Sequence, residues 1–99
     1  MTVYILNNMA IHDRGQYQAY LRAFMPVFQK YEGSILAVQD APRPLEGEWP
    51  YDRTVLLSFP SREAFDRWRQ SAEYQEIAQH RLAGTVSNVV VLDGFEMKR

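Results

Sequence analysis

The fold of this chain is decided by residues 45–74, which read LEGEWPYDRTVLLSFPSREAFDRWRQSAEY. The pattern predicts a loop and then a strand over residues 53–59, which Pro60 terminates. Ser61 is a suitable N-cap for the helix that follows, and Ser71 for a second helix that runs to about residue 83. The inner positions expected in that second helix are Tyr74, Ile77, Ala78, Arg81 and Leu82.

Toward the N-terminus, the pattern predicts one strand and one long helix. The strand covers residues 3–11, and most side chains on both of its faces are apolar, so we expect both faces to be covered. Asp13 is a good N-cap for a helix that reaches about residue 31, and Gly33 is a plausible stop. An aromatic stripe at three- and four-residue spacing marks the buried side of this helix: Tyr17, Tyr20, Phe24, Phe28 and Tyr31.

Two further strands and one long loop complete the pattern. A short strand covers residues 34–39, and a loop rich in proline and charge covers residues 40–52. Leu45 and Trp49 are apolar, so we expect this loop to pack against its own core or against a partner. The run NVVVL at residues 88–92 fits a last strand that is buried on both sides.

The order of these elements defines an α+β fold. Strand, helix, strand, strand, broken helix and strand form the ferredoxin-like split βαβ pattern, with a four-stranded antiparallel sheet and helices on one face. The other face would then be bare, although few of its side chains are polar. Two such sheets placed face to face would remove that surface and give a dimeric α/β barrel. We therefore expect residues 1–99 to form one domain that associates as a homodimer.

Composition excludes several classes of protein. The 99 residues are 46% hydrophobic, carry a net charge of −1 and include no cysteine. A near-neutral charge argues against nucleic-acid or anionic-membrane partners, and the lack of cysteine excludes disulfides and thiolate metal sites. The N-terminus has no charged leader, and no apolar run approaches the length that spans a bilayer. We expect a cytoplasmic protein.

Several short motifs resemble one known family. They lie in the first helix and its exit, in a loop of the form LEGxW, in an F-P-S turn and in the last two helices. The matching positions are Asp13, Tyr17, Tyr20, Tyr31, Gly33, Leu45, Glu46, Gly47, Trp49, Arg53, Phe59, Pro60, Ser61, Trp68, Ser71, Glu73, Tyr74 and Arg81. The chain is identified as similar to the DUF1330 family, and the resemblance implies the dimeric α/β-barrel fold with no assigned reaction. Among the departures from the family pattern, Glu32 replaces one glycine of a Gly-Gly pair.

A few polar residues are candidates for ligand binding. Asn7 and Asn8 lie on an otherwise apolar strand, so we expect one of them to have a partner or to face a cavity. Trp49, Arg53 and Arg81 could line a cleft that binds a small anionic or aromatic molecule. The tentative ligand-binding set is therefore Asn8, Trp49, Arg53 and Arg81. The alternative is structural, with Glu46 pairing with one of these arginines to fix the loop.

No catalytic residue can be assigned. His12 and His80 are the only histidines and show no metal-binding spacing, so we expect no metal site. The favoured function is a dimer with a small-molecule pocket between sheet and helices and no cofactor. An enzyme acting on a small organic acid or aromatic, of the cofactor-independent monooxygenase or isomerase kind, is the alternative by analogy of fold. A haem-handling protein, with His80 as the first candidate ligand, is a third possibility.

Overall fold

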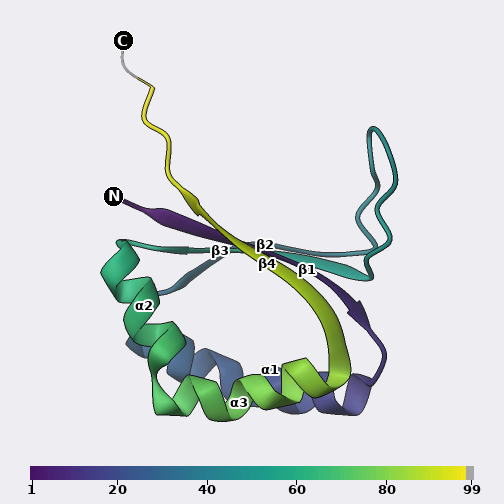
Figure 1. The fold of residues 1–99 in the computed structure, drawn as a ribbon, viewed down its shortest axis with the longest axis horizontal. Coiled ribbons are helices and arrows are strands. Elements are labelled where there is room, and N and C mark those ends of the chain that lie inside the picture. Colours follow the sequence, from purple (N-terminus) through teal and green to yellow (C-terminus); the bar gives the residue numbers. More distant parts are fainter. Residues whose placement is uncertain (98–99) are drawn as a thin grey trace.

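The computed structural model describes residues 1–97, which form one layer of strands and one layer of helices (Figure 1). The elements follow one another in the predicted order. They are β1 (Val3–Ile11), α1 (Arg14–Lys30), β2 (Ser34–Asp40), β3 (Arg53–Phe59), α2 (Arg62–Gln70), α3 (Ala72–Gly84) and β4 (Thr85–Asp93).

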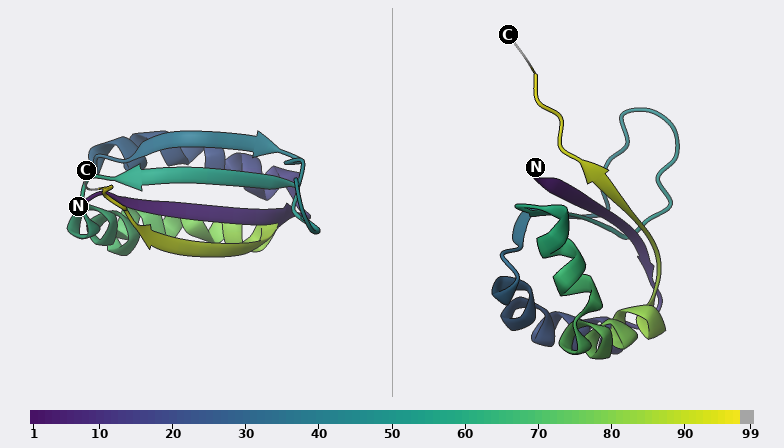
Figure 2. Two further views of the ribbon diagram at one scale, coloured as in Figure 1. Left: turned by 90° about the horizontal axis from the view of Figure 1, so that it is seen from above. Right: turned by 60° about the vertical axis from the view of Figure 1, so that its left-hand side comes forward.

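The four strands form one antiparallel sheet in the order β2-β3-β1-β4. All three helices cover the same face of this sheet, and the other face is open (Figures 1 and 2). In the register of the central strands, Asn7 lies opposite Val55, and Asn8 lies opposite Thr54. This topology confirms the predicted ferredoxin-like α+β fold with helices on one face.

Each helix begins at the residue that the sequence predicts. The backbone N–H of Gln16 donates to the Asp13 carboxylate at 3.2 Å, and that of Ala64 donates to the Ser61 hydroxyl at 3.1 Å. Such caps satisfy backbone donors that the first turn of a helix leaves without partners. The capping residues alone therefore locate the first turn of these helices in the sequence.

An aromatic cluster between α1, α2 and β3 forms the centre of the core. Phe28 is fully buried, and its ring centroid lies 4.7 Å from that of Phe24, 5.3 Å from that of Phe59 and 5.7 Å from that of Trp68. Edge-to-face contacts such as those with Phe59 and Trp68 are the arrangement that aromatic quadrupoles prefer. The predicted aromatic stripe therefore packs against the sheet.

The turn after α1 needs glycine for a steric reason. A Cβ atom at Gly33 would lie 2.2 Å from the ring of Phe28, so any side chain there would displace the centre of the core. The left-handed conformation of this turn falls one residue earlier, on Glu32, whose φ is 66°. That conformation is costly for a residue with a Cβ atom.

Replacing Glu32 by glycine should therefore stabilise the protein. We expect the free energy of unfolding to rise by about 0.5–1 kcal/mol, because glycine adopts positive φ without strain. Gln29→Gly is the matched control, since Gln29 lies inside α1, where glycine should instead cost about 1 kcal/mol. Urea denaturation of both variants measures the two changes, and destabilisation by Glu32→Gly would contradict the prediction.

The C-terminal strand differs from the prediction in two ways. β4 begins at Thr85 rather than at residue 88, because Thr85 pairs with Ile11 at the far end of β1. It is also an edge strand within the chain, so its apolar run is not buried on both sides: Val89, Val90 and Leu92 are about half exposed, at 47%, 50% and 48%.

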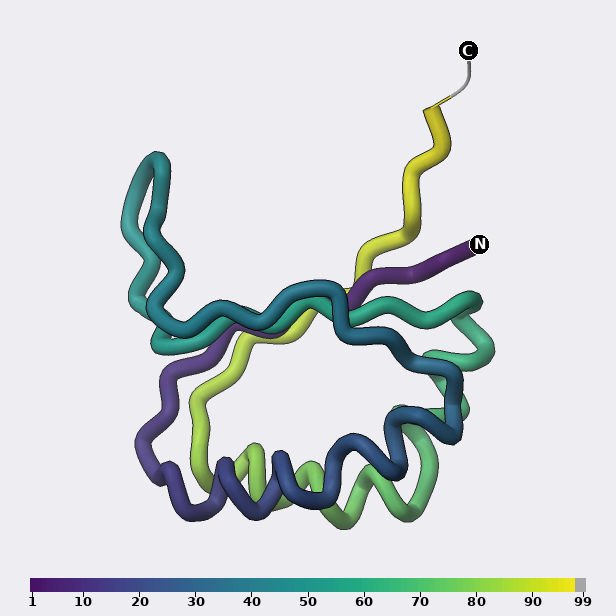
Figure 3. Tube along the Cα trace, turned by 180° about the vertical axis from the view of Figure 1, so that it is seen from behind, coloured from purple at the N-terminus to yellow at the C-terminus, as the bar shows by residue number. Residues whose placement is uncertain are grey.

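One smaller expectation was wrong, and one of the two alternatives predicted for the long loop does not hold. Leu82, which we expected on the inner side of α3, is 64% exposed, because Ala78 and Arg81 occupy the side that faces the sheet. The loop of residues 41–52 does not cover its own core. It rises from the sheet on the side away from the helices (Figures 1 and 3), and Leu45 is 92% exposed. Among the described residues, no helix has the length and apolar character needed to cross a membrane.

Candidate functional site

A cavity of about 350 Å³ lies between the sheet and the helices. β1 contributes Asn7, α1 contributes Tyr20, α2 contributes Trp68, and α3 contributes Tyr74 and Arg81. Apolar side chains such as Ile5, Leu57 and Phe65 form the remaining wall on the sheet and α2. The cavity therefore combines an apolar lining with a few polar groups, as small-molecule sites usually do.

Three polar atoms of these lining residues are buried without a hydrogen-bond partner among residues 1–97. They are Asn7 Oδ1, Trp68 Nε1 and Arg81 Nε. A buried polar atom without a partner costs free energy, and most proteins leave only a few of them. Two of these atoms are donors and one is an acceptor, so the residues around this one cavity carry polar groups that the described chain leaves without partners.

Two tyrosine hydroxyls meet at the same cavity. The Oη atoms of Tyr20 and Tyr74 are 3.1 Å apart, and both side chains are buried. Burial raises the pKa of Tyr20 well above its ordinary value, and the Tyr74 hydroxyl raises it further. Tyr20 therefore stays protonated at neutral pH. The guanidinium carbon of Arg81 lies 5.9 Å from the centroid of the Tyr20 ring, within cation–π range.

A second, smaller cavity of about 150 Å³ adjoins the first toward β2. Tyr17 and Arg53 line it, and the Arg53 guanidinium lies 5.6 Å from the centroid of the Tyr17 ring. Arg53 Nε is 3.4 Å from the Asp40 carboxylate, but the geometry is not that of a hydrogen bond, so Nε has no hydrogen-bond partner in the described chain. Asp40 is itself largely exposed, which weakens the ion pair.

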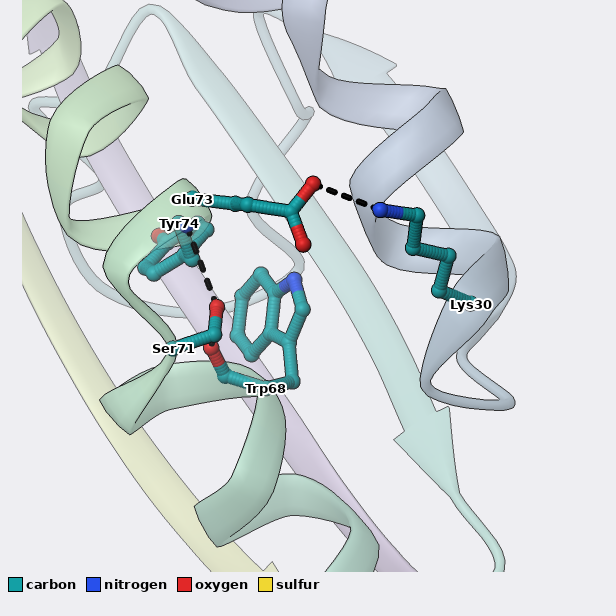
Figure 4. Close-up of polar contacts among 5 residues, drawn as sticks. All are labelled: Lys30, Trp68, Ser71, Glu73 and Tyr74. Carbon is teal, nitrogen blue, oxygen red and sulfur yellow. Dashed lines mark hydrogen bonds and ion pairs between the residues drawn. The ribbon is translucent and has the colours of Figure 1, made fainter.

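Ser71 holds the two aromatic walls of the larger cavity in place (Figure 4). Its hydroxyl donates to the carbonyl of Trp68 at 2.8 Å and accepts from the backbone N–H of Tyr74 at 3.1 Å. The Ser71 side chain thus caps the end of α2 and the start of α3. The ring centroids of Trp68 and Tyr74 lie 3.9 Å apart. Lys30 and Glu73 form an exposed ion pair at 2.6 Å that links α1 to α3 beside them.

Replacing Ser71 by alanine should destabilise the protein by about 1–2 kcal/mol, because α3 loses its N-cap. Threonine at this position keeps the hydroxyl, so Ser71→Thr should recover most of that loss. Chemical denaturation of the two variants measures the difference. Equal stability of Ser71→Ala and the wild-type protein would show that the break between α2 and α3 does not depend on this cap.

The structure divides the four predicted ligand-binding residues between the two faces of the sheet. Arg53 and Arg81 lie on the helix side and line the two cavities. Asn8 and Trp49 lie on the open face, where Trp49 Nε1 donates to Thr54 Oγ1 and Thr54 Oγ1 donates to Asn8 Oδ1, both at 3.1 Å. The four do not line one cavity, since successive residues of a strand point to opposite faces. Their role in binding stays a prediction.

Of the neighbouring asparagines, Asn8 has a hydrogen-bond partner, and Asn7 faces the cavity. Tyr20, Trp68 and Tyr74 were not predicted as site residues, because their spacing in the sequence indicates core packing. The signal that could have found them is the polar atom that each carries, since a buried tyrosine or tryptophan needs a hydrogen-bond partner.

The remaining candidates lie elsewhere. Glu46 is not paired with either arginine in the described chain, because it belongs to the loop on the open side of the sheet. The ring of His80 is exposed and lies 2.8 Å from Gln16 Oε1, through its Nδ1 atom. Within residues 1–97, no three histidine, aspartate or glutamate side chains gather closely enough to hold a metal ion.

The fold and the cavity define a small ferredoxin-like protein with a partly polar cavity between its sheet and its helices. The family model described as "Domain of unknown function (DUF1330)" matches residues 2–95. The chain therefore belongs to the DUF1330 family, as the sequence motifs predicted. Among proteins with curated descriptions, none matches it.

Solved structures share the fold at low sequence identity. RPA0582 from Rhodopseudomonas palustris, a protein of unknown function, is 22% identical with a TM-score of 0.84, over 97% of this chain and 84% of that one. A mutant of SnoaB from Streptomyces nogalater, a cofactor-independent oxygenase, is 11% identical with a TM-score of 0.70, over 97% and 95%. A dimeric ferredoxin-like protein from Jannaschia sp. CCS1 is 17% identical with a TM-score of 0.67, over 95% and 100%.

Proposed function

We propose that this protein is a homodimer in which each subunit binds a small organic ligand in the cavity between sheet and helices. The observation that carries the proposal is the set of three buried polar atoms without partners in the described chain, on Asn7, Trp68 and Arg81, around that one cavity. A ligand carboxylate would accept hydrogen bonds from Trp68 Nε1 and Arg81 Nε, whereas Asn7 Oδ1 is an acceptor and needs a donor on the ligand, such as a hydroxyl or N–H group.

The chemistry of the lining narrows the class of ligand. Arg81 supplies a positive charge, and Trp68 and Tyr20 supply neutral donors, so the site favours an acceptor with negative charge, such as a carboxylate. The aromatic walls favour a flat or apolar body attached to that group. A volume of about 350 Å³ lies near the small end of ordinary ligand sites. A small organic acid meets all three conditions.

A panel of small aromatic and aliphatic monocarboxylates tests this proposal. At least one member should raise the melting temperature of the wild-type protein, since a ligand that binds the folded state stabilises it. Arg81→Gln should abolish that rise. Arg67→Gln, an exposed arginine on α2 outside both cavities, should keep it. The proposal fails if no member stabilises the wild-type protein, or if Arg81→Gln responds as the wild type does.

The homodimer is supported by the open face of the sheet. Exposed apolar side chains lie along it, including Val86 at 64% and Val90 and Leu92 at about half. Monomers rarely leave so much contiguous apolar surface in water. A ferredoxin-like neighbour is described as dimeric. In a face-to-face pair, the loop of residues 41–52 would reach past the sheet toward the partner (Figure 3).

An enzyme is the second candidate, and the paired hydroxyls of Tyr20 and Tyr74 favour it. Because Tyr20 stays protonated, it could donate a hydrogen bond to a developing enolate or alkoxide in the cavity. A neighbour of this fold is a cofactor-independent oxygenase. Oxygen uptake in the presence of dihydroxyaromatic acids tests this candidate: uptake that Tyr20→Phe abolishes would support it, and no uptake would argue against it. The cytoplasmic location and the lack of nucleic-acid or membrane partners remain predictions.

A further inference from the structure

The two cavities under the sheet share part of their lining. Asn7, Tyr20 and Leu57 line both of them. Arg81 lines only the larger cavity, and Arg53 lines only the smaller one. The pair therefore forms one two-lobed site, with Arg53 in the smaller lobe, Arg81 and the exposed Arg69 in the larger one, and the amide of Asn7 where the lobes meet.

The two arginines are placed alike. Each guanidinium lies over a tyrosine ring, Arg53 at 5.6 Å from the Tyr17 centroid and Arg81 at 5.9 Å from the Tyr20 centroid. The two rings are stacked with their centroids 6.1 Å apart, so the two guanidinium groups lie over neighbouring rings of α1. Burial raises the pKa of Tyr17, and both arginine charges lower it, so both lie within electrostatic reach of that ring.

The positive charge of this site is poorly balanced by the protein itself. Arg81 forms no ion pair within residues 1–97, and Arg53 has only the loose contact with exposed Asp40. The Nε atoms of both arginines are buried without hydrogen-bond partners in the same part of the chain. Two like charges in a partly buried site repel each other, and anionic groups placed beside both would relieve that repulsion.

We propose that the ligand of this site is an elongated organic dianion whose two acidic groups bind Arg53 and Arg81. Its midpoint lies beside the Asn7 amide, between Leu57 and the Tyr20 ring. This inference rests on the proposed function and adds a second acidic group on the ligand, which Arg53 binds. A compact anion such as inorganic phosphate would contact one arginine at a time, because Arg53 lines only the smaller lobe and Arg81 only the larger one.

Calorimetric titration with carboxylates of matched chain length tests whether a second acidic group strengthens binding. The probes are succinate, glutarate and adipate, each compared with the monocarboxylate of equal carbon number. In the wild-type protein, we expect the best dicarboxylate to bind about tenfold or more tightly than its monocarboxylate, because a second charge-assisted hydrogen bond forms. Arg53→Gln and Arg81→Gln should each remove that advantage.

Two further variants and one control test the role of the Arg53 charge. Asp40→Asn removes the carboxylate that competes for Arg53, so the dicarboxylate should bind several-fold more tightly. Arg53→Lys keeps the charge and should keep part of the advantage, while Arg67→Gln on the exposed face of α2 should change nothing. Circular dichroism melting curves confirm that each variant is folded before it is titrated.

The outcomes separate this inference from the proposed function. Equal affinity for dicarboxylates and monocarboxylates, with both dependent on Arg81, would overturn the dianion and leave the small-acid site intact. An advantage that survives Arg53→Gln but is lost in Arg69→Gln would also overturn it, because Arg69 stands at the rim of the larger cavity. Absence of binding by either series would overturn the dianion, and the wider monocarboxylate panel would then decide the proposed function.

Discussion

Replacement of Phe28 by alanine should lower the free energy of unfolding by about 3–5 kcal/mol, as is usual for a large aromatic side chain removed from a core. Phe28 is fully buried and contacts the rings of Phe24, Phe59 and Trp68. Domains of this kind are stable by about 5–15 kcal/mol, so the loss takes a large share of the total. Urea denaturation followed by circular dichroism measures it.

Gln29→Ala is the matched control for this experiment, because Gln29 follows Phe28 in α1 and its side chain is exposed. We expect that variant to change stability by less than about 0.5 kcal/mol. If Phe28→Ala were no more harmful than Gln29→Ala, the aromatic cluster would not be the centre of the core, and the position of the cavity beside it would be in doubt.

Replacement of Leu92 by aspartate should convert the proposed homodimer into a monomer. Leu92 is 48% exposed on the open face of the sheet and lies opposite Tyr4 of β1. A twofold interface buries each substituted residue twice, so two unpaired carboxylates would lose their water on association. We expect the dissociation constant of the dimer to rise about a hundredfold or more. Light scattering across a range of concentrations measures it.

Leu82→Asp provides the control, since Leu82 is an equally apolar residue that is 64% exposed on α3, on the other side of the molecule. That variant should remain a dimer. A wild-type protein that is monomeric at all concentrations, or a Leu82→Asp variant that dissociates as readily as Leu92→Asp, would contradict a dimer formed through the open face.

The fold could be predicted from the sequence because its signals are local. Period-two alternation identifies β1 and β3, and the side-chain caps at Asp13, Ser61 and Ser71 place the helix starts. The motif match then agreed with the order of elements. The apolar run of β4 misled the prediction, because an edge strand with apolar side chains on both faces has the same pattern as a strand buried within its own chain.

The site was less predictable because it depends on which face each residue occupies. Asn7 and Asn8 are neighbours with the same side chain, yet one faces the cavity and the other faces the loop. Trp49 resembles a ligand-binding aromatic in sequence but lies on the open side, whereas Trp68 was assigned to the core and lines the cavity. The packing of α1 against α3 brings Tyr20, Tyr74 and Arg81 together, although they lie far apart in the sequence.

A crystal structure of the purified protein, soaked with the organic acid that stabilises it most, tests the central claim most directly. We predict density for the acid between the sheet and the helices, with its carboxylate against Arg81 and accepting a hydrogen bond from Trp68 Nε1 or from the side-chain N–H of Asn7. A cavity closed by side chains, with Arg81 paired to a protein carboxylate and the acid bound elsewhere or absent, would contradict the claim.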